Sequence, residues 1–292
     1  MKGIILAGGF GTRLHPSTIG VSKQLLPIYD KPLIYYPLTT LMSAGIKDIL
    51  VITSTTYKES FKKLLGDGSK LGISLTIETQ DYPNGIAEAF LIGEKFIGKE
   101  DVTLILGDNI FYGSNLHKQL IINNENKFIG AKIFAYKVPD PKRYGVVEFD
   151  SNLRVLSIEE KPENPKSNYS VTGLYIYGNE VISLAKKLKP SERGELEITD
   201  LNKLYLDKNQ LEVFLLDSGD AWLDAGTADS LLEASHFVQT IQNRQFIQIG
   251  CPEEVALKRE FISSKDFIAL AKESPLNKYG DYLRIIAEKT IS

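Results

Sequence analysis

A glycine-rich segment near the start of the chain carries the strongest chemical signal. It reads L-A-G-G-F-G-T-R-L-H-P from Leu6 to Pro16 and follows a short apolar run. Its three glycines allow backbone N–H groups to turn toward an anion without an obstructing Cβ atom. Arg13 adds a fork of donors that suits phosphate, and Lys23 adds a second cation. Together these residues predict a site for a polyphosphate.

Two other glycine motifs fit the sequence less well. A dinucleotide-binding G-x-G-x-x-G would begin at Gly9, but Leu14 stands at its third glycine and no ribose-binding acid ends the next strand-like run. A Walker-type G-x-x-x-x-G-K runs from Gly93 to Lys99, but Glu100 replaces the Ser or Thr and the segment ends a predicted helix. We interpret the second match as coincidence and disfavour a dinucleotide oxidoreductase.

Two aspartates are candidates for binding a metal ion. Asp108 ends the apolar run V-T-L-I-L-G-D-N, and Asp224 lies in the short apolar stretch A-W-L-D. Mg²⁺ takes one or two carboxylates together with water and phosphate oxygens, so an aspartate beside a triphosphate loop suits it. From spacing alone, each residue could instead be an ordinary turn or capping residue.

The elements that must position these residues alternate between apolar runs and amphipathic stretches. Strands buried on both faces are predicted at Gly3–Ala7, Asp48–Ser54, Leu75–Gln80 and Val102–Gly107. Helices are predicted at Pro32–Ala44, Glu59–Leu65 and Ile86–Phe96. The alternation predicts a mainly parallel sheet with helices on both faces, whose ligands bind beyond the carboxyl ends of the strands.

The second half of the chain changes character. Strand-like runs that suggest an added antiparallel or mixed layer occur at Ala131–Val138, Gly145–Asp150, Val155–Glu160 and Val171–Gly178. Two helices and a strand follow at Ile198–Leu206, Ala228–Thr240 and Leu211–Leu216, and three helices at Pro252–Arg259, Ser263–Ala271 and Leu276–Glu288. We therefore predict an α/β fold with Rossmann-like three-layer architecture, a mixed and mainly parallel sheet, an added small sheet and C-terminal helices.

Composition narrows the classes of partner. The 292 residues include 34 Lys and Arg against 37 Asp and Glu, a balance that argues against nucleic acid as the main partner. The single cysteine, Cys251, excludes a disulfide within the chain and a multi-cysteine metal site, and it favours a reducing, cytoplasmic location. No apolar run approaches the ~18 residues of a membrane span, so no membrane partner is expected.

The motifs resemble those of the sugar-phosphate nucleotidyltransferases. The family pattern G-G-x-G-T-R-L-x-P-x-T, followed by K and P, appears from Gly8 to Thr18 with Lys23 and Pro27. Further segments occur in the family's order over nearly the whole chain, at Leu106–Gly113, Glu159–Pro162, Val171–Tyr175, Arg193–Asp200 and Ala221–Thr227. One such segment alone would be a weak signal, whereas the ordered set is highly specific.

The resemblance implies a nucleotide-diphospho-sugar transferase fold and a Mg²⁺-dependent reaction of dTTP with glucose 1-phosphate. The attacking phosphate is already anionic, so none of the three histidines is needed as a general base. Catalysis would consist of positioning and charge neutralisation. Arg13, Lys23 and Mg²⁺ would neutralise the α-phosphoryl group and the departing pyrophosphate, and Lys161 would hold the attacking phosphate.

The resemblance also assigns roles to single positions. It implies that the nucleotide is bound by Leu6, Gly8, Gly9, Gly11, Thr12, Arg13, Gln80, Gly85 and Asp108. Within this set, Gln80 and Gly85 would read the base. The sugar phosphate would be bound by Asn109, Gly145, Glu160, Lys161, Val171 and Arg193. The metal would be held by Asp108 and Asp224, while Trp222 is expected nearby as a sugar-side wall or as core.

The resemblance further divides the chain into a nucleotidyltransferase domain, 1–240, and a C-terminal helical segment, 241–292. Within the domain, about 1–110 would bind the nucleotide and about 111–240 the sugar. In relatives the C-terminal helices help form a regulatory nucleotide-sugar pocket at a subunit interface of a homo-oligomer, here expected to be a tetramer. The matching positions are Gly113, His117, Glu254, Val255 and Lys258.

Several departures and alternatives remain at this stage. The family commonly has W-L-D-T-G-T-H, whereas here Ala225 replaces the first Thr and Ala228 replaces the His. Lys258 stands where an arginine is frequent, and a lysine cannot contact phosphate in a bidentate way, so feedback inhibition is expected to be weaker.

The alternatives to the favoured reaction are the same chemistry with another nucleotide such as UTP or with another hexose 1-phosphate, and a non-catalytic nucleotide-sugar sensor.

Overall fold

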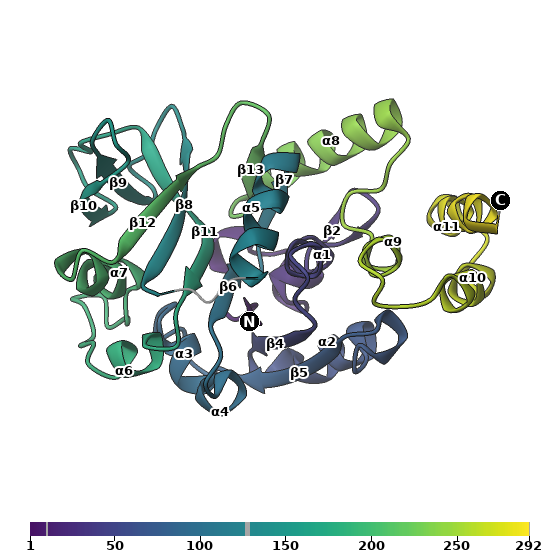
Figure 1. The fold of residues 1–292 in the computed structure, drawn as a ribbon, viewed down its shortest axis with the longest axis horizontal. Coiled ribbons are helices and arrows are strands. Elements are labelled where there is room, and N and C mark those ends of the chain that lie inside the picture. The colour runs from purple at the N-terminus through teal and green to yellow at the C-terminus, as the bar shows by residue number, and fades with distance from the viewer. Residues whose placement is uncertain (10, 126–128, 292) are drawn as a thin grey trace.

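A nine-stranded mixed sheet forms the centre of the molecule in the computed structural model, which describes residues 1–9, 11–125 and 129–291 (Figure 1). Its parallel half has the order β6-β1-β4-β5, built from β1 (Lys2–Leu6), β4 (Asp48–Thr53), β5 (Ser74–Thr79) and β6 (Val102–Leu106). The carboxyl ends of these strands meet at one edge of the sheet. The glycine-rich loop follows β1 at that edge, and Asp108 follows β6.

The strands of the second half extend the same sheet instead of stacking on it as an added layer. They are β8 (Ala131–Lys137), β9 (Gly145–Phe149), β10 (Val155–Glu160), β11 (Tyr169–Tyr177) and β12 (Leu211–Leu215). The end of β11 pairs antiparallel with β6, and its start pairs with β9 through Ser170. β8 pairs along the other edge of β11. One long central strand therefore joins both halves of the chain.

Each face of the sheet carries a hydrophobic core, and successive residues of β1 alternate between the two. Ile4 packs in the core that contains Phe90, and Ile5 packs in the core that contains Leu41, and all four are fully buried. Burial on both faces explains why this strand is a nearly continuous apolar run. The predicted three-layer α/β fold is confirmed.

Helices cover both faces of the sheet. The first core is covered by α3 (Glu88–Ile92), α4 (Glu94–Ile97), α6 (Val181–Ala185) and α7 (Ile198–Asp207). The second core is covered by α1 (Tyr35–Ser43), α2 (Lys58–Leu65), α5 (Ser114–Glu125) and α9 (Pro252–Lys258).

Two short antiparallel ladders lie outside the main sheet. β7 (Asn109–Tyr112) pairs with β13 (Ala221–Asp224), and the register sets Asp224 opposite Asn109. β2 (Pro27–Ile28) pairs with β3 (Lys31–Pro32). The β7–β13 ladder thus brings Asp224 next to the start of β7, which Asp108 immediately precedes, although the two predicted metal ligands are distant in the sequence.

The C-terminal helices lie at the end of the molecule opposite β9 and β10 (Figure 1). α8 (Ala228–Gln245) begins with Thr227 as its N-cap and continues past residue 240, where the predicted domain boundary falls. α10 (Ser264–Glu273) and α11 (Lys278–Ile291) share a separate small core with buried Cys251. Within the described residues, no helix is both long enough and apolar enough to cross a membrane.

Two local predictions are wrong. β5 is an edge strand, because the sheet ends there, and its residues alternate between exposed and covered instead of being buried on both faces. The predicted helix Ile86–Phe96 is divided at Gly93 into α3 and α4. The helices α5 and α6 and the strand β7 did not stand out in the sequence, since their apolar periodicity is short or weak.

Candidate active site

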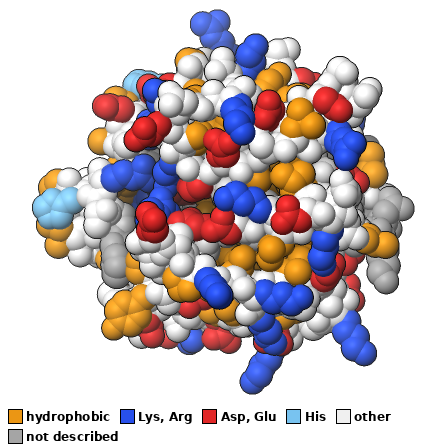
Figure 2. Space-filling view, turned by 90° about the vertical axis from the view of Figure 1, so that its left-hand side faces the viewer, with side chains coloured by type: hydrophobic (Ala, Val, Ile, Leu, Met, Phe, Trp, Pro, Cys, Tyr) orange, Lys and Arg blue, Asp and Glu red, His pale blue; other side chains and the backbone are white. Residues whose placement is uncertain are grey.

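One cavity of about 560 Å³ opens between the carboxyl-end edge of the parallel strands and the β9–β10 hairpin. Nine residues predicted from the sequence line it: Arg13, Asp108, Asn109, Gly145, Glu160, Lys161, Val171, Arg193 and Asp224. Basic and acidic side chains gather around a hollow on the face of the molecule shown in Figure 2. The cavity is thus a charged one, as expected for phosphorylated ligands.

The glycine-rich loop leaves β1 between its two neighbouring strands. The carbonyl of Leu6 accepts a hydrogen bond from the N–H of Gly107 at 2.9 Å. Gly9 and Gly11 have φ values of 100° and 59°, which residues with a Cβ rarely adopt. Phe10 of the motif lies outside the described residues. A 3₁₀ turn over Thr12–Leu14 follows and carries Arg13 to the cavity.

Asp108, which lines the cavity, forms an ion pair with Lys23, which is not among the described lining residues. The Lys23 Nζ lies 2.5 Å from Asp108 Oδ2, and Lys23 is only 7% exposed. Burial would raise the pKa of Asp108, but the Lys23 ammonium and hydrogen bonds from Lys23 and Asn109 hold that pKa below its ordinary value. The predicted phosphate cation and the predicted metal ligand are therefore direct partners, which the sequence did not indicate.

This pair should make stability depend on pH. Because the pKa of Asp108 is lowered on folding, its contribution is present above the unfolded value of about 4 and is lost as pH falls through the folded value. We expect the Asp108→Asn variant to lose stability relative to the unsubstituted protein at pH 7 and to lose less at pH 3. Urea denaturation at both pH values measures this difference, and an equal deficit at both would contradict it.

Asn109 is a buried connector between the walls of the cavity. Its Oδ1 accepts hydrogen bonds from Trp222 Nε1 at 2.6 Å and from the N–H of Gly173 at 3.0 Å. Its Nδ2 donates to Asp108 Oδ1 at 2.8 Å. Asn109 was predicted to bind the sugar. Its side-chain oxygen already accepts hydrogen bonds from two protein donors. Trp222 lines the cavity and fixes Asn109 at the same time.

Asp224 faces two adjacent residues of the loop before β9. Tyr144 donates its hydroxyl to Asp224 Oδ1 at 3.0 Å, and an Arg143 nitrogen lies 3.9 Å from Oδ2. Burial and the Asp224 carboxylate raise the pKa of Tyr144 to about 12, so its hydroxyl remains a donor at neutral pH. A Cβ built on Gly226 would lie 3.1 Å from Asp224 Oδ2 and 3.5 Å from an Arg13 nitrogen. Arg13 and Asp224 therefore border the same space.

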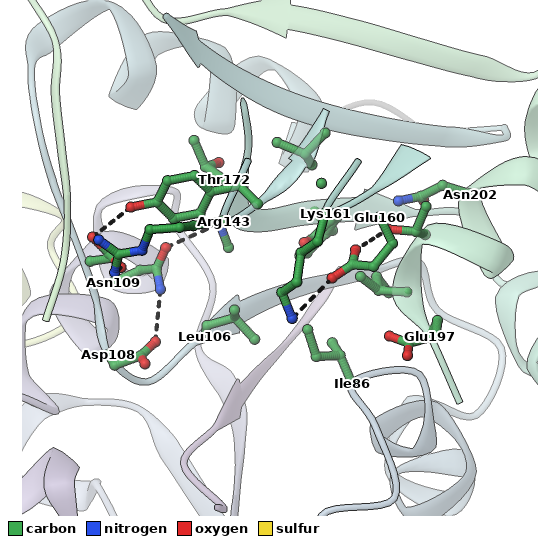
Figure 3. A pocket seen from close by; sticks show the side chains of 18 of the residues that line it. Ile86, Leu106, Asp108, Asn109, Arg143, Glu160, Lys161, Thr172, Glu197 and Asn202 are labelled. Carbon is green, nitrogen blue, oxygen red and sulfur yellow. Dashed lines mark hydrogen bonds and ion pairs between the residues drawn. The ribbon is translucent and has the colours of Figure 1, made fainter. Parts of the chain in front are cut away.

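The register of the strands explains why several residues predicted to bind the sugar phosphate lie together. The β9–β10 ladder sets Glu160 opposite Gly145, and a Cβ on Gly145 would lie 3.8 Å from Cβ of Val171. Thr199 of α7 donates to Glu160 Oε2 at 2.6 Å. The Lys161 ammonium lies 3.4 Å from Glu160 Oε1 and points into the cavity between the side bearing Asp108 and the side bearing Glu197 (Figure 3).

Arg193 lines the cavity and forms ion pairs with two nearby glutamates. Its guanidinium lies 2.7 Å from Glu195 Oε2 and 3.2 Å from Glu197 Oε1. Burial would lower the pKa of Arg193, but the neighbouring glutamates raise it, so the side chain stays charged. An incoming phosphate would have to compete with these two carboxylates for the guanidinium.

The two predicted base-reading residues lie together beside the glycine-rich loop. The Gln80 amide nitrogen donates to Glu88 at 2.6 Å and to the carbonyl of Gly85 at 3.3 Å. A Cβ on Gly8 would lie 3.0 Å from Gln80 Oε1. Gly85 has a φ of 106° and packs so closely against the Leu196 backbone that a Cβ there would clash at 2.3 Å. These residues border the loop but are not part of the cavity wall described above.

The positions predicted to be regulatory lie on, or next to, two helices that pack on the second core. Gly113 precedes α5 against Asp220, and His117 lies on α5, where burial lowers its pKa despite the nearby Asp220 carboxylate. On α9, the Lys258 ammonium lies 2.6 Å from Glu254 Oε1. Tyr282 of α11 donates to the other oxygen of Glu254. Val255 packs against the second core.

Several polar residues of the cavity wall received no role in the sequence analysis, among them Arg143, Tyr144 and Thr199. Tyr144 immediately precedes Gly145, and Thr199 lies inside the R-G-E-L-E-I-T-D segment, so both stood beside recognised signals. Nothing in local spacing indicated which of their atoms would face a carboxylate, because that depends on how distant strands pair.

Comparisons with known proteins agree over most of the chain. Residues 2–241 match the model of a family described as Nucleotidyl transferase. A glucose-1-phosphate thymidylyltransferase of Neisseria meningitidis is 56% identical over 289 residues, which cover 99% of this chain and 100% of the relative. One of Mycobacterium tuberculosis is 52% identical over 289 residues, again covering 99% and 100%.

Solved structures share the fold. A Bacillus anthracis protein, assigned as a glucose-1-phosphate thymidylyltransferase and solved with sucrose, aligns with a TM-score of 0.75 and 43% identity over 81% of this chain and 94% of that one. A UDP-glucose pyrophosphorylase solved with UDP-glucose aligns with a TM-score of 0.72 over 82% of this chain and 98% of that one. The latter is 24% identical and supports the fold alone.

Proposed function

Because the chain belongs to the nucleotidyl transferase family, we propose that this enzyme transfers a thymidylyl group from dTTP to α-D-glucose 1-phosphate, giving dTDP-glucose and pyrophosphate. The observation that carries the proposal is the convergence on one cavity of Arg13, the two aspartates and the whole predicted sugar-phosphate set. The activity named for relatives 52–56% identical over nearly the full length supplies the two substrates.

The proposed step needs no proton transfer. A phosphate oxygen of the sugar phosphate forms a bond to the α-phosphorus of dTTP, while the bond from that phosphorus to the bridging oxygen breaks and pyrophosphate leaves. Both reactants are anions, so the barrier is one of repulsion and alignment. None of His15, His117 and His236 is among the described residues that line the cavity, which agrees with chemistry that uses no general base.

In this proposal four cations divide between the two reactants. Arg13, carried by the glycine-rich turn, and Lys23 neutralise the α-phosphoryl group and the departing pyrophosphate. Lys161, which is paired with Glu160, and Arg193, which is paired with Glu197, hold the attacking phosphate. Glu160 accepts a hydrogen bond from a sugar hydroxyl, and Thr199 keeps its carboxylate oriented.

Members of this family generally use a divalent metal, and we propose Mg²⁺. Asp108 and Asp224 both line the cavity, and the N–H of Ala225 donates to the carbonyl of Asp108 at 3.0 Å, so their segments are joined directly. Among the described residues, no group of three or more His, Cys, Asp or Glu could hold a metal. Two carboxylates completed by phosphate oxygens and water fit Mg²⁺. When bound, the ion would neutralise phosphate charge.

We also propose roles for the residues around the nucleotide. The loop residues Leu6, Gly8, Gly9, Gly11 and Thr12 direct backbone groups toward the triphosphate. Gln80 and Gly85 read the pyrimidine, which requires the Gln80 amide to release part of its bonding to Glu88. In this proposal, residues up to about 110 bind the nucleotide, and residues from about 111 to 240 bind the sugar phosphate.

The proposal extends to assembly and location. We propose a cytoplasmic homotetramer in which the helical segment 241–292 forms an interface and a feedback site for a nucleotide sugar. Gly113, His117, Glu254, Val255 and Lys258 would contribute to that site. The Lys258–Glu254 ion pair means that a phosphate there would compete with a carboxylate for the ammonium.

The direct test measures pyrophosphate release when glucose 1-phosphate is mixed with one of four nucleotides: dTTP, UTP, CTP or GTP. We expect release with dTTP and Mg²⁺, and its loss when EDTA removes the metal. Thymine exceeds uracil by one methyl group, which is worth about 0.8 kcal/mol when buried, so we expect UTP to react more slowly by only about fourfold through this contact.

Other outcomes identify the alternatives. Release with UTP at a rate far above that with dTTP would indicate a uridylyltransferase. Tight binding of dTDP-glucose without pyrophosphate release from any triphosphate would indicate a nucleotide-sugar sensor and would overturn the proposed transfer.

A further inference from the structure

Tyr144 contacts functional groups on both sides of the cavity. Its hydroxyl donates to Asp224 Oδ1 at 3.0 Å, and its backbone carbonyl accepts from the N–H of Lys161 at 3.0 Å. Lys161 has a φ of 43°, which a non-glycine residue adopts only when its surroundings hold it there. One residue thus holds a predicted metal ligand through its side chain and the predicted phosphate cation through its backbone.

The ring of Tyr144 continues this connection to the second aspartate. It packs edge-on against Trp222 with a centroid distance of 5.1 Å. Trp222 Nε1 donates to Asn109 Oδ1 at 2.6 Å, and Asn109 Nδ2 donates to Asp108 Oδ1 at 2.8 Å. A continuous chain of contacts therefore runs from Asp224 to Asp108 without using a ligand.

Asp224 needs such support because of where it lies. It ends β13, one strand of a two-stranded ladder outside the main sheet, and its side chain is 24% exposed. Its other oxygen faces Arg143 only at 3.9 Å. The Tyr144 hydroxyl is the closer of the two contacts, and its distance of 3.0 Å lies within hydrogen-bond range, whereas the Arg143 nitrogen does not. The orientation of the Asp224 carboxylate relative to Asp108 therefore depends mainly on this hydroxyl.

We propose that Tyr144 is a positioning residue whose hydroxyl orients Asp224 for the divalent metal, while its ring and backbone keep Asp108 and Lys161 in register with it. The inference rests on the proposed function for the identity of the metal site. It goes beyond that function because the proposed step gives Tyr144 no role. Hydrogen-bond partners of metal ligands typically change metal affinity by about 10–100-fold when removed.

The test is the Tyr144→Phe variant, which removes one oxygen and keeps the ring on Trp222. Mn²⁺ binding in the presence of dTTP is measured from the EPR signal of the free ion, with dTTP alone subtracted. We expect Mn²⁺ to bind about 10–100-fold more weakly than to the unsubstituted protein. The Mg²⁺ concentration for half-maximal turnover should rise correspondingly, with turnover recovering at high Mg²⁺, while the thermal unfolding midpoint changes little.

Tyr136→Phe is the matched control. Tyr136 also packs edge-on against Trp222, at 6.2 Å, but is not part of the cavity wall, so its variant should bind Mn²⁺ as the unsubstituted protein does. Unchanged Mn²⁺ affinity in Tyr144→Phe, or an equal loss in Tyr136→Phe, would overturn the inference. The Mn²⁺ titration needs no turnover, so failure of the unsubstituted protein to release pyrophosphate would count against the proposed function and leave this readout intact.

Discussion

Replacing Lys161 with methionine should lower turnover by about 10²–10³-fold, the effect seen when one preorganised donor to a developing charge is lost. Methionine keeps the length of the side chain and removes its charge. The ammonium of Lys161 points into the cavity beside Glu160, whereas no other lysine is among the described residues that line it. Loss of this cation leaves Arg193 alone to offset the repulsion between the attacking phosphate and the carboxylates of Glu160 and Glu197.

Steady-state pyrophosphate release at saturating dTTP measures the effect, with kcat and KM for glucose 1-phosphate determined separately. A fall in kcat that exceeds the rise in KM would indicate that the charge acts mainly in the transition state. Lys142→Met is the matched control, because Lys142 lies near Lys161 at a neighbouring surface pocket but outside the cavity wall. Turnover of Lys161→Met equal to that of Lys142→Met would refute the assigned role.

Replacing Asp108 with asparagine should reduce activity by at least about 10³-fold, because a metal ligand contributes several kcal/mol of charge stabilisation at the transferred phosphoryl group. The same change should destabilise the fold. Lys23 is 7% exposed and would lose the carboxylate with which it is paired. Breaking a buried pair on one side costs about 3–5 kcal/mol, and we expect the lower end because the Asp108 side chain is 26% exposed.

The double variant Lys23→Met/Asp108→Asn separates the two effects. Removing both charges should restore much of the free energy of unfolding, measured in urea, because no unpaired buried charge remains. Activity should stay low, since the carboxylate is still absent. Recovery of activity together with stability would contradict the metal-ligand role of Asp108 and would indicate that the single variant failed only through its fold.

Much of the architecture could be predicted from local pattern. Residues of β1, β4 and β6 are apolar on both faces, and this pattern identified the parallel core of the sheet. The location of the cavity at the carboxyl ends of these strands followed from that topology. The same reasoning failed for β5, because its sequence S-L-T-I-E-T alternates apolar and polar residues, which is the pattern of a strand with one exposed face and not of one buried on both.

The hydrogen bonds and ion pairs between residues of the site could not be predicted in the same way. Asn109 was expected to contact sugar, but its carbonyl oxygen is bonded to Trp222 and Gly173. Lys23 was expected to face phosphate, and it lies against Asp108. Each of these contacts joins segments far apart in the chain, and local spacing carries no information about the register that aligns them.

The amino-acid order was sufficient to identify which chemistry this chain can perform, because residue types and glycine positions set local charge and backbone freedom. The tertiary structure determined which of these side chains come into contact. The register of β9 with β10 places Glu160 at Gly145, and that of β7 with β13 places Asp224 beside Asp108. Hydrogen bonds and ion pairs act over a few ångströms, so a shift of one residue in either ladder would turn these side chains to the opposite face and abolish the site.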